Sequence, residues 1–309
     1  MTLLSAFLVI IGLSLFEIVS SVDNAIINAE VLSTMGQRFR RFFLTWGIII
    51  AVFAVRGLLP FIIVYTTIPS LGPIGAITST FNNDPKIAAT IKEAAGLPLA
   101  LGGTFLIFLF FNWLFLEPKS YGLRGERFFH AQGGWFYTVV SIILAFLVYY
   151  AFNYSQPVAL GFVLGSTIFF IVHGFRQYAE KMETSLATSH KSDLSKFLYL
   201  EVIDASFSID GVIGAFAFTF SVPLIFFGNS LGAIVLRQMT ISNIERVKKY
   251  KYLKNGAMYS ILFLGSVMVL ESLGFEIPNE ITPILTILII GYFFMKSKNE
   301  LRRQTLRLQ

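Results

Sequence analysis

The stretch from Pro98 to Leu116 reads PLALGGTFLIFLFFNWLFL and contains no charged residue. An α-helix rises about 1.5 Å per residue, and roughly 20 apolar residues are needed to cross the hydrocarbon core of a bilayer. The length and composition of this stretch are therefore typical of a transmembrane helix.

Eight further apolar runs surround this stretch and are candidates for additional membrane spans. They are Leu3–Met35, Phe42–Tyr65, Trp135–Phe152, Pro157–Phe175, Phe197–Phe220, Val222–Thr240, Gly256–Leu273 and Thr282–Met295. Of the 309 residues, 55% are hydrophobic and only 14% are charged, whereas a soluble domain carries about 25% charged residues. The sequence thus predicts an all-α, polytopic helical membrane protein with about nine transmembrane helices, built as one transmembrane domain over residues 1–309.

Basic residues are concentrated in alternate connections between the apolar runs. Of the 24 Lys and Arg residues, 20 follow the first, third, fifth, seventh and ninth runs, and only Lys86 and Lys92 lie in the other connections. Because basic loops stay on the cytoplasmic side, this pattern predicts a multi-pass protein of a prokaryotic-type plasma membrane, with its N-terminus outside and its C-terminus in the cytoplasm. Cytoplasmic loops that meet anionic lipid explain the net charge of +6, which therefore does not indicate binding to nucleic acid.

The segment Ile68–Gly75 follows the second apolar run and is itself apolar, but Pro69, Gly72 and Pro73 interrupt it. Two structures fit this pattern: an ordered external loop, or a re-entrant segment that dips into the membrane. The frequent proline and glycine favour the ordered loop.

The composition also excludes several kinds of chemistry. The chain has no Cys, which rules out disulfides, thiolate nucleophiles, zinc–thiolate sites and iron–sulfur clusters. Its three His residues lie near predicted membrane edges and are too few for a haem or a His-rich metal site. The nucleotide-binding pattern Gly-x-x-x-x-Gly-Lys is absent, so any transport is expected to be secondary, and no organic cofactor is expected.

Two of the apolar runs contain related acidic motifs. The first is Glu17–Ile26 (EIVSSVDNAI) and the second is Asp204–Ile213 (DASFSIDGVI). Both read as an acid, five residues, an Asp, a small or turn-prone residue, and an Ile three positions after the Asp. Each motif is followed by an apolar run with one internal arginine, Arg56 after the first and Arg237 after the second.

Five spans separate the starts of the two motifs, so the second copy crosses the membrane in the opposite direction to the first. Such an arrangement is typical of an inverted-topology repeat with its site at the bilayer midplane. The predicted parts are a first repeat half over residues 1–116, linking spans and a cytoplasmic loop over 117–196, a second half over 197–274, and a last span with a basic tail over 275–309. Counted along the chain, the first three spans form the first half, and the sixth to eighth spans form the second half.

Apart from Glu30 at the cytoplasmic end of the first run, five carboxylates lie inside these two runs, where each costs about 2.5–3.5 kcal/mol at a helix centre. They are Glu17, Asp23, Glu201, Asp204 and Asp210. A purely structural interpretation pairs them with Arg56 and Arg237. Two arginines cannot neutralise five carboxylates, so we expect a functional ion site.

Helix geometry separates the acids within each motif. Residues six positions apart differ by about 120° around a helix, so Glu17 and Asp23 do not share a face of an unbroken helix, nor do Asp204 and Asp210. Either the paired acids have different roles, or each helix breaks between them. The Ser and Gly residues nearby favour breaks near Asp23 and Asp210, which would free backbone carbonyls as ligands.

The donors gathered by these motifs are hard oxygen atoms, which suit Mn²⁺, Ca²⁺ or Mg²⁺. We predict Asp23 and Asp210 as direct ligands and Asn24 as a third. Glu17 and Asp204 are expected either beside these ligands or as proton carriers.

The remaining charged residues of the motifs have supporting roles in this prediction. Glu201 is expected to line the cytoplasmic entrance. Arg56 and Arg237 are expected to keep carboxylates ionised while the site is empty and to move away when a cation arrives. A fixed ion pair is an equally good interpretation of each arginine.

At these motifs the chain resembles the TerC family of integral membrane proteins, and the resemblance extends to the run GNSLGAIVLR that ends at Arg237. The family belongs with the LysE-type transporters, which share an inverted-repeat helical fold. The resemblance implies export of a divalent cation, chiefly manganese, and a supply of manganese to secreted enzymes. The chain departs from many members in having about nine predicted spans rather than about seven, and in its Asp210–Gly211 pair.

Three other functions fit parts of the pattern. Intramembrane aspartyl proteases also use two membrane aspartates, but they carry Tyr-Asp and Gly-x-Gly-Asp sequences, whereas here Val22 precedes Asp23 and Ile209 precedes Asp210. We therefore expect no enzymatic activity. A membrane scaffold that assists metal delivery to secreted metalloenzymes, or insertion through the secretion machinery, is the main alternative, and a cation channel is another.

Overall fold

The computed structural model describes residues 3–78, 90–91, 94–188, 192–278 and 280–307, and every regular element within these ranges is helical. The first half of the chain contains α1 (Leu3–Ser20), α2 (Val22–Ser33), α3 (Gln37–Phe42), α4 (Ile48–Ile50), α5 (Leu59–Thr67), α6 (Gly72–Thr78), α8 (Gly96–Leu116), α9 (Glu126–Ala131) and α10 (Phe136–Phe152). The second half contains α11 (Gln156–Thr188), α12 (Asp193–Ala215), α13 (Val222–Lys248), α14 (Leu253–Ser272) and α15 (Ile281–Arg307).

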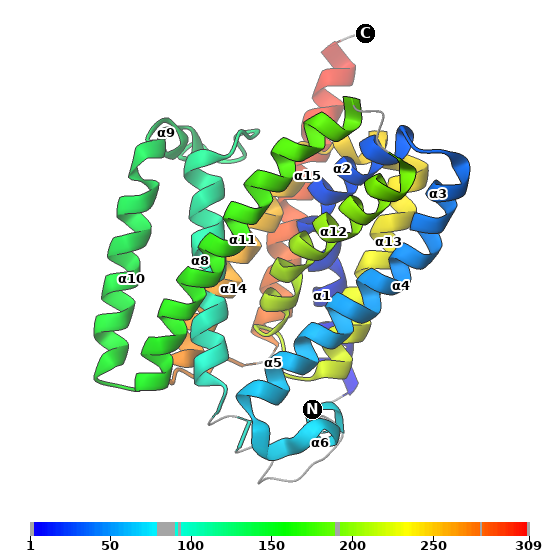
Figure 1. Cartoon of the computed structure of the whole chain (residues 1–309). Helices are drawn as coiled ribbons and strands as arrows, with labels where there is room; N and C mark the ends of the chain where they lie inside the picture. Colours follow the sequence, from blue (N-terminus) through cyan, green and yellow to red (C-terminus); the bar gives the residue numbers. More distant parts are fainter. Residues whose placement is uncertain (1–2, 79–89, 92–93, 189–191, 279, 308–309) are drawn as a thin grey trace.

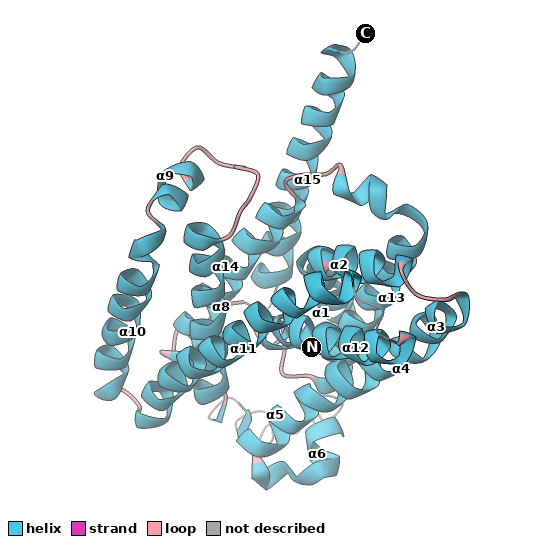
Figure 2. Ribbon diagram, turned by 45° about the horizontal axis from the view of Figure 1, so that its top comes forward, coloured by secondary structure: helices cyan, strands magenta, loops and turns pink. Residues whose placement is uncertain are grey.

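Short helices of other types complete these elements. Two π-helical segments, η1 (Phe43–Gly47) and η2 (Ala51–Leu58), join α3 to α5, and two 3₁₀ turns, η3 (Pro69–Leu71) and η5 (Gly133–Trp135), precede α6 and α10. Figure 2 shows the resulting bundle of helices joined by loops. The predicted all-α fold is confirmed.

Six of the described helices are long and apolar enough to cross a membrane. They are Leu3–Ser20, Gly96–Leu116, Gly133–Phe152, Gln156–Tyr178, Leu253–Ser272 and Ile281–Gln304. A seventh span results if Val55–Thr67 and Pro69–Thr78, which meet at an angle of 101°, count as one broken span or re-entrant segment. The polytopic membrane fold is therefore supported by the structure.

The other two predicted spans form helices α12 and α13, which do not meet the same criteria. Acids and Lys196 interrupt the apolar character of α12, and the apolar part of α13, Val222–Gln238, is shorter than 18 residues. All nine predicted runs are thus helical in the described part of the chain, while nine membrane crossings stay a prediction.

The helices are arranged side by side with alternating directions (Figure 1). The chain begins at the end of the bundle where α6 lies, and α1 leads to α2 at the opposite end, where α3, α9 and the C-terminus also lie. Helix α12 runs back in the direction opposite to α1. The basic connections that contain α3 and α9 therefore share one end of the molecule with the basic C-terminal helix, as the charge distribution predicts.

Glycine residues bring the central helix α8 into close contact with its neighbours. A Cβ atom on Gly161 of α11 would lie 2.6 Å from the carbonyl oxygen of Leu97. A Cβ atom on Gly165 would overlap the carbonyl oxygen of Leu101. On the α14 side, a Cβ on Gly103 would lie 3.0 Å from the carbonyl oxygen of Gly265. Because lipid tails are as apolar as leucine, helices in a membrane associate through such close packing.

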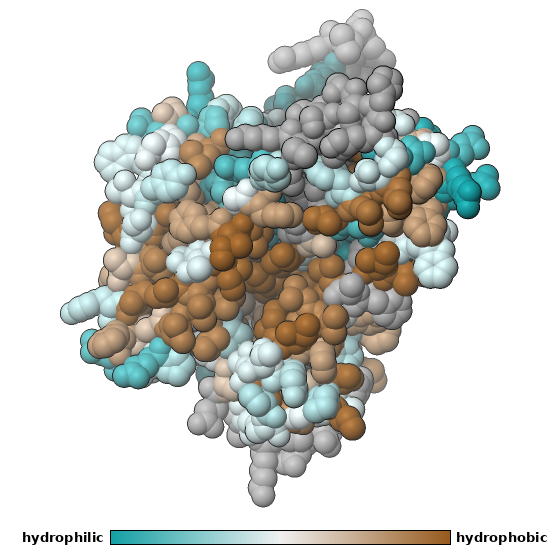
Figure 3. Space-filling view, viewed as in Figure 1, coloured by the Kyte–Doolittle hydropathy of each residue, from teal (hydrophilic) through white to brown (hydrophobic). Residues whose placement is uncertain are grey.

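Large apolar side chains cover the outside of the bundle. Figure 3 shows hydrophobic residues gathered across the middle of one face and hydrophilic residues toward its upper and lower edges. On α10 the exposed side chains include Tyr137, Ile142, Phe146 and Tyr149. This surface matches a hydrocarbon environment better than water, because a soluble protein seldom exposes large contiguous apolar areas.

The contact between α8 and α11 can be tested by adding single methyl groups. Gly165→Ala places a methyl group against the backbone of α8, so we expect the two helices to separate slightly, at a cost of about 1–3 kcal/mol and with a lower melting temperature in detergent. Gly174→Ala is the matched control, since nothing lies within 4 Å of a Cβ at that position of the same helix. Equal melting of the two variants would contradict this packing.

The absence of Cys allows the predicted topology to be tested with single cysteines. Ile74→Cys on exposed α6 and Asn153→Cys between α10 and α11 should react with a membrane-impermeant maleimide in intact cells. Arg303→Cys on α15 should react only after the cells are permeabilised. Labelling of Arg303→Cys in intact cells would show that the C-terminus is outside.

Candidate functional site

Glu17 of α1 is fully buried and is paired with an arginine. Its Oε1 atom accepts a hydrogen bond from Arg56 Nη2 at 2.5 Å and another from Ser21 Oγ at 3.0 Å. Its Oε2 atom has no hydrogen-bond partner among the described residues. Burying a carboxylate in this way is tolerable only because a positive charge lies in direct contact with it.

Two glycines enclose the Glu17 side chain from the second half of the chain. A Cβ on Gly211 of α12 would overlap Oε2 of Glu17. A Cβ on Gly232 of α13 would lie 2.7 Å from the Cβ of Glu17. Ser14, one turn earlier on α1, donates a hydrogen bond from Oγ to the carbonyl of Gly228 at 2.9 Å. Gly211 thus makes room for a carboxylate from the other half.

A second acid–arginine pair occupies the corresponding place in the second half. Arg237 of α13 lies 3.9 Å from Asp204 of α12, at the outer limit of an ion pair, and its guanidinium stands 4.1 Å from the ring centre of Phe43. One turn before Asp204, both carboxyl oxygens of Glu201 are buried without a hydrogen-bond partner in the described part of the chain. A Cβ on Gly47 would overlap this carboxyl group.

The two halves therefore use the same arrangement, in which the first acid of each motif meets an arginine from the next helix of its own half. Arg56 also interacts electrostatically with Asp204, which connects the two pairs. Packing follows the same pattern, because α1 lies against α13, α12 lies against η2, and α8 lies against α14. An inverted repeat would produce such an exchange of contacts, and the division into halves over residues 1–116 and 197–274 stays a prediction.

The expected helix break is present in one motif and absent from the other. Helix α1 ends at Ser20 and α2 begins at Val22, so the regular helix is interrupted at Ser21 alone, and the backbone hydrogen bonds from Ser21 N to Glu17 O at 3.1 Å and from Ala25 N to Ser21 O at 3.0 Å are kept. Helix α12 continues through Asp210 to Ala215, and the prediction of a break there is wrong. The physical reason is that Gly211 serves as a close-packing position, which an unbroken membrane helix tolerates.

Asp210 is paired with a third arginine that the sequence analysis did not select. Arg176 of α11 contacts Asp210 at 2.7 Å, and both side chains are only 11% exposed. The predicted span ended at Phe175, which placed Arg176 in a loop, but α11 continues to Thr188. The helical spacing of the sequence could have revealed Arg176, because Arg176 shares a helix face with buried Phe169.

The predicted joint metal site is only partly described. Asp23 and Asn24 belong to α2, but their side chains lie outside the described part of the structure. Among the residues that are described, no group of three or more His, Asp and Glu side chains could hold a metal ion. The structure therefore brings together Glu17 with Arg56, Asp204 with Arg237, and Asp210 with Arg176.

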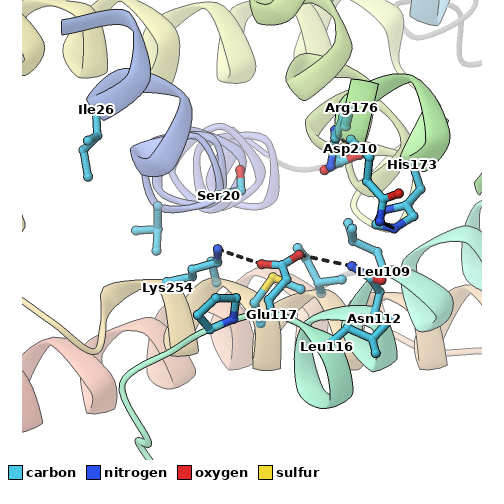
Figure 4. Close-up of a pocket in the computed structure, with 16 residues that line it drawn as sticks. Ser20, Ile26, Leu109, Asn112, Leu116, Glu117, His173, Arg176, Asp210 and Lys254 are labelled. Carbon is cyan, nitrogen blue, oxygen red and sulfur yellow. Dashed lines mark hydrogen bonds and ion pairs between the residues drawn. The ribbon is translucent and has the colours of Figure 1, made fainter. Parts of the chain in front are cut away.

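A polar cavity of about 480 Å³ lies beside Asp210, and we call it the polar chamber (Figure 4). Its polar lining residues are Ser20, Asn112, Glu117, His173, Arg176, Gln177, Asp210 and Lys254. They come from α1, α8 and its C-terminal end, α11, α12 and α14. The chamber thus joins the first acidic helix to the second and is bordered by the linking helix α11.

Glu117 is the second carboxylate of the polar chamber. It accepts a hydrogen bond from Asn112 Nδ2 at 3.2 Å and is paired with Lys254 Nζ at 2.8 Å (Figure 4). Burial raises the pKa of the Glu117 carboxyl, but the charge and hydrogen bond of Lys254, together with the charges of Arg176 and His173, outweigh this effect and leave the pKa below its usual value. Glu117 is therefore ionised at neutral pH.

The buried Glu17–Arg56 pair makes a prediction about stability. Arg56→Gln leaves a buried carboxylate without its partner, so we expect a loss of about 3–5 kcal/mol and a much lower melting temperature in detergent. The double variant Glu17→Gln/Arg56→Gln should regain most of this loss, because neither buried charge is left alone. Exposed Arg302→Gln on α15 is the control for a lost positive charge. A double variant no more stable than Arg56→Gln would contradict the pairing.

Comparison with known proteins places this arrangement in one family. A family model described as "Protein of unknown function (DUF475)" matches residues 22–304, which extend from α2 to α15. No curated protein and no solved structure matches the chain. Because the matched segment covers most of the sequence, the chain belongs to the DUF475 family.

Proposed function

We propose that this protein is a secondary transporter that exports a divalent cation, with Mn²⁺ as its principal cargo. The observation that carries the proposal is that three carboxylates in the helix bundle each contact their own arginine: Glu17 with Arg56, Asp204 with Arg237 and Asp210 with Arg176. Structural packing alone does not require three such pairs in a chain with so few charges. Transport of a cation through a carboxylate site would explain all three acid–arginine pairs.

In this proposal the arginines act as tethered counter-ions. With no cargo bound, each guanidinium neutralises a carboxylate that would otherwise be buried and unpaired, at a cost of several kcal/mol. An arriving divalent cation supplies two positive charges and replaces two of the arginines. The protein can then change conformation both empty and loaded without exposing an uncompensated charge to the membrane interior.

The chemistry of the available donors supports the choice of cargo. Carboxylate and amide oxygens prefer hard cations such as Mn²⁺, Mg²⁺ and Ca²⁺, and the chain has no Cys for softer metals. The resemblance to the TerC family favours manganese among these ions. In the predicted site Asp23, Asn24 and Asp210 bind the ion directly, and the buried carboxyl of Glu201 is a candidate for carrying a counter-transported proton.

The decisive experiment is uptake of radioactive Mn²⁺ into inside-out vesicles that contain the protein, because export then appears as accumulation. We expect wild-type uptake, and at least about a tenfold loss in Asp23→Asn, Asp204→Asn and Asp210→Asn, since each removes a negative charge from the path. Asp193→Asn is the matched control: it lies at the start of the same helix as Asp204, where its carboxylate accepts a hydrogen bond from the backbone of Gly36.

Competition by Mg²⁺ and Ca²⁺ in the same vesicles measures the selectivity of the site. Folded wild-type protein without flux of any of the three ions would refute the transporter proposal. The membrane scaffold that assists metal delivery or protein insertion would then become the leading explanation of the fold.

A further inference from the structure

The polar chamber contains as many negative as positive groups. Asp210 is paired with Arg176 at 2.7 Å, and Glu117 is paired with Lys254 at 2.8 Å. The charges of the two carboxylates and the two cations therefore cancel. His173 also lines the chamber, where its ring stacks on Phe169 and its Nε2 atom lies 3.0 Å from Nε2 of Gln177.

One buried polar atom of the chamber has no protein partner in the described part of the chain. Asn112 is only 1% exposed, and its Nδ2 atom donates to Glu117, but its Oδ1 atom accepts no hydrogen bond from any described group. A buried carbonyl oxygen left in this state costs about 1–3 kcal/mol. Because Asn112 lines the chamber, water or a ligand that enters the chamber can supply the missing partner.

The free oxygen of Asn112 and the two carboxylates are hard donors of three residues that line one cavity. Asp210 and Glu117 line the same cavity, and each carboxylate has its own counter-ion. Three oxygen donors with water in the remaining positions match the coordination of Mn²⁺ or Mg²⁺, which commonly keep several waters.

We propose that the polar chamber is a divalent-cation site on the cytoplasmic path to the central carboxylates, where Glu117, Asn112 and Asp210 bind the ion directly or through water. The ion displaces Lys254 and Arg176, so two tethered positive charges are replaced by one doubly charged ion. This role in a transport path rests on the proposed function, whereas binding of the ion to the chamber can be tested separately.

The surroundings of the two cations fit this exchange. Lys254 belongs to the first turn of α14, and its side chain is 35% exposed, so it can turn toward water when it leaves Glu117. Arg176 is 11% exposed and contacts Asp210 at 2.7 Å. Its guanidinium therefore controls access to Asp210, while Lys254 controls access to Glu117.

The chain offers a closely matched control pair. Lys251 contacts Glu300 at 3.1 Å, and these side chains are 35% and 37% exposed, compared with 35% and 33% for Lys254 and Glu117. Lys251 lies three residues before Lys254, but neither Lys251 nor Glu300 lines the chamber. The variant Lys251→Gln thus removes the same positive charge as Lys254→Gln but leaves the lining of the proposed site unchanged.

The test is equilibrium binding of Mn²⁺ to the purified full-length protein, with free Mn²⁺ measured by electron paramagnetic resonance. Glu117→Gln should weaken the chamber site by about 10–100-fold. Lys254→Gln and Arg176→Gln should each strengthen Mn²⁺ binding by about tenfold, because a tethered competitor is removed. Lys251→Gln and Glu300→Gln should bind as wild type.

The gain of affinity separates this proposal from a structural role, since a damaged fold would bind Mn²⁺ more weakly. Arg176→Gln leaves Asp210 without its partner and can fail to fold, so Lys254→Gln, at a side chain that is 35% exposed, is the principal variant. Wild-type binding by Glu117→Gln, or equal binding by Lys254→Gln and Lys251→Gln, would overturn the proposal.

Flux measurements distinguish this result from failure of the transporter proposal. If Asp204→Asn abolishes Mn²⁺ flux while Glu117→Gln binds Mn²⁺ as wild type, the transporter stands and the chamber site is refuted. If the chamber variants show the expected changes in binding but wild type shows no flux, the chamber is a divalent-cation site in a protein that does not transport, and only its role in a path is refuted.

Discussion

The contact between Glu17 and Arg56 is the constraint on which the rest of the site depends. A carboxylate that is 0% exposed inside an apolar bundle is tolerable only with a positive charge beside it, and this contact is 2.5 Å long. The pair connects η2 to α1 through the Arg56 side chain. It also requires the helices of the second half to leave space for the carboxylate, which Gly211 and Gly232 provide. Electrostatics inside one half thus determines packing between the halves.

The same logic explains why three helix pairs carry one ion pair each. Asp204 is balanced from α13 by Arg237, and Asp210 is balanced from α11 by Arg176. The pairs differ in tightness, since Arg237 lies 3.9 Å from its acid and also stands over the ring of Phe43. A guanidinium with an alternative partner in an aromatic ring can leave a carboxylate at lower cost, because cation–π contact replaces part of the lost attraction.

Much of the fold follows from local properties of the sequence, but part of the site does not. Apolar runs and alternating basic loops predict the helices and their directions, because both depend on each helix and its ends alone. Arg176 was missed because hydropathy ends at Phe175, although the helix continues and its long side chain reaches back to Asp210. Gly211 indicated a break that α12 does not have, because glycine in a membrane helix also permits close packing, and only the partner, Glu17, reveals which role applies.

Charge balance also bears on selectivity for the proposed cargo. The polar chamber holds two carboxylates and two tethered cations, so a monovalent ion that replaces one cation leaves the other pair closed. In the proposed site, a divalent ion would satisfy both carboxylates at once and would release both side chains. Preference for a double charge would therefore arise from neutrality in a medium of low dielectric constant, where unbalanced charge is most costly. Discrimination among Mn²⁺, Mg²⁺ and Ca²⁺ would depend instead on the donor oxygens and on how readily each ion loses water.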